Sequence, residues 1–294
     1  MKPELAYDLR HWLVEPDFAS MQRQPLPMNK KQEKLATTRT EKTGLRRIKG
    51  PAGSGKSLVV AARAAQLATE KKDILVVTFN ITLCHYLRDL AIRYLKNLEV
   101  QTPGCGKFIN EQITWCHFHY WCKDMCLKAD LENEYQQLWK KRHLNKEEYE
   151  LVNINLVKLV NKALDELLDD KSLKKYDAIM VDEGQDFNIN WWKILRRVRR
   201  SNNSEMLLVA DETQDLYNRA KYWTDEEMKG AGFIGAWSRL NQIYRMPREL
   251  IKYLQQYAKE YLPNASINLS KSKSPVYLRD QGPVEMRWLQ VSGN

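Results

Sequence analysis

The eight residues from Gly50 to Ser57, with the letters GPAGSGKS, limit the fold of this chain more than any other run. They match the pattern G-x-x-x-x-G-K-[ST] at every fixed position. Glycines in such a run let backbone N–H groups turn inward around a phosphate, because a Cβ would block both the turn and the close approach. The run therefore predicts a phosphate-binding loop that consists of Gly50, Pro51, Ala52, Gly53, Ser54, Gly55, Lys56 and Ser57.

The last two residues of this run have separate expected roles. Lys56 is expected to reach the β- and γ-phosphates of a nucleotide, and Ser57 is expected to place its hydroxyl on Mg²⁺. The helix that begins here would point its positive N-terminus at the same anion.

The segments around the loop alternate between strand and helix patterns. Residues 45–48 are typical of a short strand, residues 58–62 continue as an apolar helix, and residues 73–79 form a nearly continuous β-branched run. Further strands are predicted at 178–181 and 206–209, and an acidic residue follows each of them closely. This order predicts an α/β fold with a mainly parallel sheet and a ligand at the carboxyl ends of its strands.

The other segments suggest how the chain is divided. We expect a lead-in over residues 1–25, a first domain over 26–123 and 171–240, a helical insertion over 124–170, and the beginning of a second domain over 241–294, with a last strand near 284–291. Residues 113–121 form a short aromatic stretch. The helix after the second strand is expected to bury one stripe made of Leu83, Tyr86, Leu87, Leu90, Tyr94 and Leu95.

The composition limits the partners and the compartment. The chain has 294 residues, 43% of them hydrophobic, and a formal net charge of +10, which favours an anionic partner. No stretch is long and apolar enough to span a membrane. Five cysteines, an odd number, argue against a disulfide framework, so we expect a reducing cytoplasm.

Two acidic runs follow the predicted strands. In the first, Asp182-Glu183-Gly184-Gln185-Asp186, we expect Asp182 to hold Mg²⁺ and Glu183 to accept a proton from an attacking water. In the second run, which begins at Asp211, Gln214 is expected to reach the γ-phosphate or its water by a neutral hydrogen bond.

Three more residues complete the predicted nucleotide site. Gln32 lies upstream of the loop, where its amide can bond both edges of an adenine. Tyr244 is an aromatic residue suited to stacking on a base, and the adjacent Arg245 is suited to neutralising transition-state charge.

Taken in order, these runs resemble superfamily 1 DNA helicases of the UvrD/Rep/PcrA type over residues 26 to 262, and among these most closely the helicases that follow a nuclease-related domain. The resemblance implies a RecA-like fold, ATP and Mg²⁺ as ligands, and a place for Gln185 in the nucleotide site. It implies contacts to single-stranded DNA, through aromatic faces and backbone-directed groups, from Thr78, Phe79, Asn80, His117, Phe118, His119, Tyr217 and Trp223.

The chain departs from this family at several points. Leu58 stands where the family often has arginine, and Arg219 stands where it has tryptophan, so that Trp223 is the nearest candidate for stacking. The later family motifs do not occur before Asn294. We therefore expect the chain to be the N-terminal half of a motor, with only the beginning of the second RecA-like domain, that does not unwind DNA alone.

Several alternatives stay open. The chain can be a DNA-dependent ATPase, or a nucleotide-gated binding module without turnover; a P-loop kinase or transporter ATPase is disfavoured because it leaves the glutamines unexplained. The arginines at 196, 197, 199 and 200 are expected to form a solvated face rather than a nucleic-acid contact. A metal site is the less favoured interpretation of Cys116, His117, His119, Cys122 and Cys126, since their spacing matches no common zinc pattern.

Overall fold

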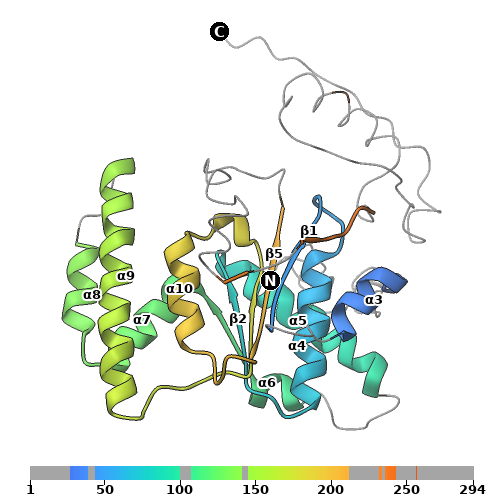
Figure 1. Ribbon diagram of the computed structural model, residues 1–294, viewed down its shortest axis with the longest axis horizontal. Helices are drawn as coiled ribbons and strands as arrows, with labels where there is room; N and C mark the ends of the chain where they lie inside the picture. The colour runs from blue at the N-terminus through green and yellow to red at the C-terminus, as the bar shows by residue number, and fades with distance from the viewer. Residues whose placement is uncertain are drawn as a thin grey trace, which may run out of the picture.

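A parallel β-sheet forms the centre of the protein. The computed structural model describes residues 27–38, 44–99, 107–140, 145–211, 232–233, 236–242 and 256. Six strands in this part of the chain pair in the order β3-β2-β4-β5-β1-β6, and every neighbouring pair is parallel (Figure 1). The strands are β1 (Leu45–Lys49), β2 (Ile74–Thr78), β3 (Ile113–His117), β4 (Ala178–Val181), β5 (Glu205–Ala210) and β6 (Ser238–Arg239).

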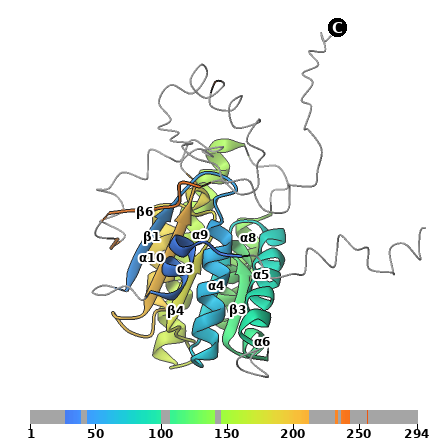
Figure 2. The same cartoon turned by 90° about the vertical axis from the view of Figure 1, so that its right-hand side faces the viewer.

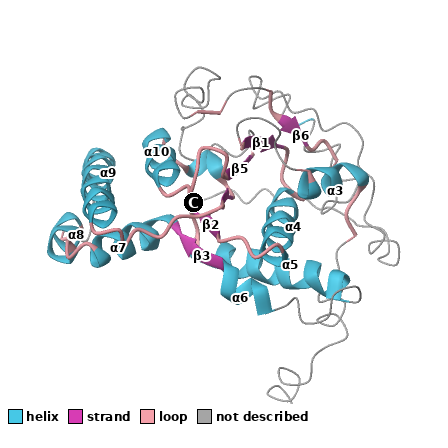
Figure 3. Cartoon of the chain, turned by 60° about the horizontal axis from the view of Figure 1, so that its bottom comes forward, coloured by secondary structure: helices cyan, strands magenta, loops and turns pink. Residues whose placement is uncertain are grey.

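Helices cover both faces of this sheet (Figure 3). One layer contains the short helix α3, the helix α4 that follows the glycine-rich loop, and α5 and α6, as Figure 2 shows from the side. The other layer contains α7, α8, α9 and α10. The bounds are α3 (Lys30–Thr37), α4 (Lys56–Thr69), α5 (Ile81–Glu99), α6 (Phe108–Gln112), α7 (Phe118–Lys128), α8 (Glu132–Leu138), α9 (Lys146–Asp169), η2 (Gly184–Asp186) and α10 (Ile189–Arg197).

The central strands are apolar on both faces because both faces are covered. All residues of β2 and β5 are buried, and side chains of β2 alternate between two hydrophobic cores. Leu75 and Val77 pack with the layer of α7 to α10, whereas Ile74 and Val76 pack under α4 and α5. The predicted α/β fold with a mainly parallel sheet is confirmed, and its apolar runs follow from this double burial.

Some local expectations differ from the structure. The aromatic stretch at 113–121 is divided between the edge strand β3 and the start of α7, where His117 accepts a hydrogen bond from the Tyr120 N–H at 3.4 Å and so ends the strand and caps the helix. On α5, Leu87, Leu90 and Leu95 are buried as expected, but Tyr86 faces solvent because it lies to one side of the buried stripe.

Residues 124–170 are mostly helical where the structure describes them. They hold the end of α7, then α8, then the long helix α9, whose first turn is fixed by a capping box between Asn145 and Glu148. The predicted lead-in (1–25) lies outside the described residues, as does almost all of 241–294. None of the described helices combines the length and hydropathy needed to cross a membrane.

Candidate nucleotide-binding site

The glycine-rich loop connects β1 to α4 and needs glycine at defined places. Gly53 and Gly55 have φ angles of 75° and 85°, in the left-handed region, and Gly55 is the residue that caps α4. At Gly50 a Cβ would lie 2.5 Å from the carbonyl oxygen of Leu240 and 2.7 Å from Ser54 Oγ. The loop therefore brings its backbone close to its neighbours and leads directly into a helix N-terminus, which favours an anion.

Lys56 is held inside this loop. Its ammonium donates hydrogen bonds to the carbonyl oxygens of Gly50 at 2.7 Å and Pro51 at 3.1 Å. It also forms an ion pair with Asp211 Oδ2 at 3.2 Å, and the two side chains are only 6% and 1% exposed. These acceptors match the three protons of the ammonium, so a bound phosphate would take over one of their places. Asp211 follows β5, and sequence reasoning gave it no partner.

Asp182 lies at the carboxyl end of β4 and is fully buried. Its Oδ1 accepts a hydrogen bond from the Glu183 N–H at 3.0 Å, but its Oδ2 has no hydrogen-bond partner among the described residues. Burial, with a smaller effect of the Glu183 carboxylate, raises the pKa of Asp182 to about 6, although Ser57 and Lys56 nearby act in the opposite direction. A buried carboxylate oxygen without a donor, close to the Ser57 hydroxyl, is suited to a cation.

Glu183 is oriented by a specific neighbour. Its backbone has a φ of 51°, which is uncommon outside glycine, and its Oε2 accepts a hydrogen bond from Gln185 Nε2 at 2.6 Å. The other end of that amide, Oε1, accepts from the Asp211 N–H at 2.9 Å. Gln185 thus connects the acidic residue after β4 to the end of β5. The strained turn and the amide together aim the Glu183 carboxylate.

Gln32 lies against the phosphate loop. Its Nε2 donates to the Ser54 carbonyl oxygen at 2.9 Å, and its Oε1 accepts from the Asn29 N–H at 2.9 Å, within a capping box of α3. A Cβ on Gly55 would lie 2.3 Å from the same Nε2. One amide proton and one lone pair of Gln32 are therefore used for structure, and base recognition by its second proton and lone pair stays a prediction.

The predicted nucleic-acid contacts are divided between surface and core. Thr78 and Phe118 are fully buried: the Thr78 hydroxyl donates to the Asn80 carbonyl oxygen at 2.7 Å, and the Phe118 ring stacks on Trp191 with centroids 4.1 Å apart. Neither side chain is accessible in this structure, and a contact of these two residues with single-stranded DNA stays a prediction. Phe79 and His119 are partly buried, and both rings contact that of Trp191.

Three residues provide accessible surface at this edge of the sheet. Asn80 is exposed, and its Oδ1 accepts a hydrogen bond from the Thr82 N–H at 3.0 Å. His117 is half-buried, and this burial lowers the pKa of its imidazole. Tyr120 is 58% exposed, with its ring centroid 5.9 Å from that of His117. Sequence reasoning missed Tyr120, although an aromatic residue directly after the His117–His119 run was a usable signal.

The cysteines of the Cys/His cluster belong to the hydrophobic core. Cys116, Cys122 and Cys126 are buried free thiols, and burial raises the pKa of each. In the part of the chain that the structure describes, no three His, Cys, Asp or Glu side chains gather as a metal-binding group. Cys122 and Cys126 are in the same core cluster as α9, so their helical spacing serves packing.

Two arginines of the cluster near α10 form ion pairs. Arg197 pairs with Asp165 of α9, and Arg200 pairs with Asp73 and Asp177 at the other end of the sheet.

The remaining predicted site residues lie outside the described residues, namely Gln214, Tyr217, Trp223, Tyr244 and Arg245.

These observations define the class of the protein. A parallel α/β sheet, a glycine-rich loop between β1 and α4, and an acidic pair at the end of β4 are the features of a P-loop nucleotide-binding protein. A family model described as an AAA domain matches residues 32–220, which is more than half of the chain. The chain belongs to this family and has an α/β RecA-like P-loop fold. A comparison with curated proteins finds no match.

Proposed function

We propose that this chain is the ATP-binding motor domain of a DNA-dependent ATPase of helicase type. The observation that carries the proposal is the meeting of three groups at one edge of the sheet: the loop ammonium of Lys56, the fully buried Asp182 carboxylate, and the Glu183 carboxylate held by Gln185. A protein that only binds phosphate needs the first of these. The other two are suited to cation binding and to proton transfer.

The proposed chemistry assigns each group a role. Lys56 leaves its contact with Asp211 and binds the β- and γ-phosphate oxygens. Ser57 and Asp182 would hold Mg²⁺, which would neutralise phosphate charge when bound; one carboxylate and a hydroxyl are a usual protein share of such a site. Glu183 accepts a proton from the attacking water, and the hydrogen bond from Gln185 keeps its carboxylate in place.

Single-stranded DNA is the proposed partner, and its contacts would lie at the carboxyl ends of β2 and β3. Asn80, His117 and Tyr120 are accessible there, and β2 neighbours β4, the strand that ends at Asp182. An exposed aromatic ring beside a polar backbone-directed group is suited to an unpaired, stacked nucleotide. The net charge of +10 supports an anionic partner. Strand separation is proposed only together with a second motor domain, and a cytoplasmic location remains part of the proposal.

Steady-state ATP hydrolysis with and without a single-stranded oligonucleotide tests this function. We expect hydrolysis that the oligonucleotide stimulates and that Lys56→Ala abolishes, whereas Lys72→Ala, a change of an exposed lysine, leaves the rate unchanged. Tight ATP binding without turnover under all conditions would contradict an ATPase. It would instead support a nucleotide-gated module, which the buried contact between Lys56 and Asp211 also favours, since this contact must be exchanged when phosphate binds.

A further inference from the structure

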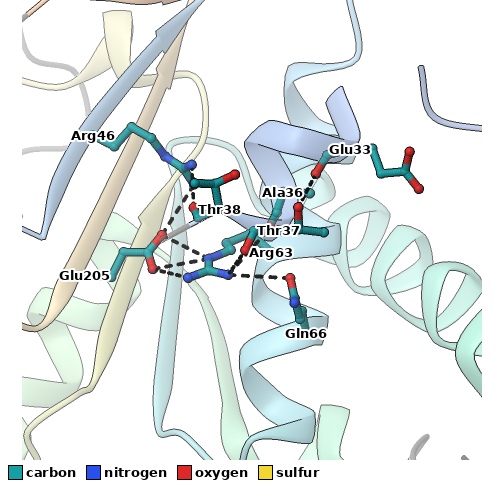
Figure 4. Close-up of polar contacts among 8 residues, drawn as sticks. All are labelled: Glu33, Ala36, Thr37, Thr38, Arg46, Arg63, Gln66 and Glu205. Carbon is teal, nitrogen blue, oxygen red and sulfur yellow. Dashed lines mark hydrogen bonds and ion pairs between the residues drawn. The ribbon is translucent and has the colours of Figure 1, made fainter. Parts of the chain in front are cut away.

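A buried ion network lies at the carboxyl end of α3, the end that is remote from the phosphate loop. Arg63 on α4 and Glu205 at the start of β5 form a two-pronged ion pair, with Arg63 Nη2 2.6 Å from Glu205 Oε2 and Arg63 Nε 3.1 Å from Oε1 (Figure 4). The two residues are only 3% and 5% exposed. Arg46 of β1 adds a second guanidinium, 3.4 Å from the same carboxylate. The site therefore holds two cationic side chains and one anionic side chain in a buried setting.

Carbonyl oxygens at the end of α3 accept further hydrogen bonds from the two guanidinium groups. Arg63 Nη1 donates to the carbonyl oxygens of Ala36 at 3.4 Å and Thr37 at 3.2 Å, and Arg46 Nη1 donates to the Thr38 carbonyl oxygen at 2.9 Å. The last carbonyls of a helix have no partners within the helix and carry a partial negative charge, so guanidinium groups stabilise them. Both arginines thus hold the carboxyl end of α3 while they share Glu205, as Figure 4 shows.

The other end of the same helix supports the phosphate loop. Gln32, in the first turn of α3, donates to the Ser54 carbonyl oxygen and packs against Gly55. The helix has only eight residues, too few to be stable in water on its own, so its position depends on these two attachments together with the packing of Ala36 in the core under α4. A change at Arg63 is then transmitted along one rigid helix to the loop.

We propose that Arg63 and Glu205 are positioning residues of the nucleotide site, which hold α3 so that Gln32 fixes the Ser54–Gly55 part of the phosphate loop. The proposal rests on nucleotide binding at that loop as the proposed function. Neither residue touches the nucleotide in this scheme. Their effect on affinity passes through Gln32.

A double-mutant cycle on ATP binding tests the proposal. Arg63→Lys keeps the charge but loses the planar guanidinium, so that a single ammonium cannot bond both Glu205 and the helix carbonyls as the guanidinium does. We expect it to raise the Kd for ATP roughly 3- to 10-fold, the effect of about one lost hydrogen bond. In a Gln32→Ala background the same change should have no further effect, because the connection is already broken. Additive effects would overturn the proposal.

Two further measurements separate positioning from folding. Hydrogen exchange of the amides of α3 should become faster in Arg63→Lys, and this readout does not depend on nucleotide. Arg93→Lys, a change of a buried arginine on α5 that lies 3.9 Å from Asp89, should alter neither α3 exchange nor ATP affinity. If Arg63→Lys does not fold, Glu205→Gln, which keeps the side-chain shape, should change both readouts in the same direction.

The outcomes also distinguish this proposal from the proposed function. If the unmodified chain does not bind ATP, the proposed function fails, while faster α3 exchange in Arg63→Lys would still show that the network holds the helix. If ATP binds and α3 exchange is unchanged in the variant, the positioning role is refuted and the proposed function stands.

Discussion

The buried contact between Lys56 and Asp211 predicts that one substitution, Asp211→Asn, lowers the stability of the protein but strengthens its binding of phosphate. Its atoms are 3.2 Å apart, and neither side chain is exposed by more than 6%. Removal of one charge from a buried pair costs about 3–5 kcal/mol when the other charge is left without compensation. In Asp211→Asn, Lys56 keeps the Gly50 and Pro51 carbonyls, and the asparagine oxygen can still accept a hydrogen bond. The expected loss in the free energy of unfolding is therefore smaller, about 2 kcal/mol.

Thermal unfolding without nucleotide measures this loss. For a chain of 294 residues, about 2 kcal/mol corresponds to a Tm roughly 3 °C below that of the unmodified protein. Asp89→Asn is the matched control, because Asp89 is 57% exposed and lies 3.9 Å from its arginine partner. Because the Asp89 carboxylate is exposed to water and its distance to the arginine is long, its loss should change stability by less than about 0.5 kcal/mol.

Nucleotide binding should change in the opposite direction. A neutral amide competes less with phosphate for the Lys56 ammonium, so tripolyphosphate should bind Asp211→Asn several-fold more tightly than the unmodified chain. Isothermal titration measures this Kd directly. A folded variant with an unchanged Tm, or with weaker tripolyphosphate binding, would refute the inference that Asp211 occupies the place of the phosphate.

Three further predictions concern the remaining site. Glu183→Gln should lower the rate of ATP hydrolysis by about 10²- to 10⁴-fold while ATP binding persists, and equal losses in both would contradict a role as base. The pKa of Asp182 is raised from 3.8 to about 6, so the folded chain binds this proton more tightly than the unfolded chain, and the associated stability, up to about 3 kcal/mol, is present below pH 4 and lost as the pH rises through 6. In urea unfolding without Mg²⁺, Asp182→Asn should gain stability relative to the unmodified protein between pH 5 and pH 8, and a constant difference would argue against this titration. Tyr120→Ala should weaken binding of a single-stranded oligonucleotide by about 1–3 kcal/mol, whereas Tyr120→Phe keeps the ring and should bind normally; equal losses in the two variants would exclude stacking.

The local part of the site was predictable because local spacing determines it. A turn that requires glycines at 53 and 55, a lysine at the first position of a helix, and acidic residues after an apolar strand all follow from short-range geometry. The central strands were predictable for a similar reason, since burial on both faces demands apolar residues at each position. These rules place Lys56, Asp182 and Glu183 at the same edge of the sheet.

The contacts between distant segments were not predictable. Lys56 meets Asp211 across 155 positions and Arg63 meets Glu205 across 142, and nothing in the intervening residues encodes either distance. Burial was equally hidden: the family resemblance assigns Thr78 and Phe118 to DNA contacts, but only the packing of α7 against Trp191 shows that the Phe118 side chain is inside. A sequence pattern indicates which residues are near a site, and the packing decides which of their side chains are accessible to a ligand.

The division of the core into two separate layers affects how such a chain can diverge. Neighbours along one strand, such as Leu207 and Leu208, belong to different layers, so the constraints on each layer are largely independent. Insertions or deletions between α7 and α9 change the volume of one layer only. Helices α3 to α6 pack on the opposite face of the sheet, so we expect such changes to leave the packing around the phosphate loop largely intact.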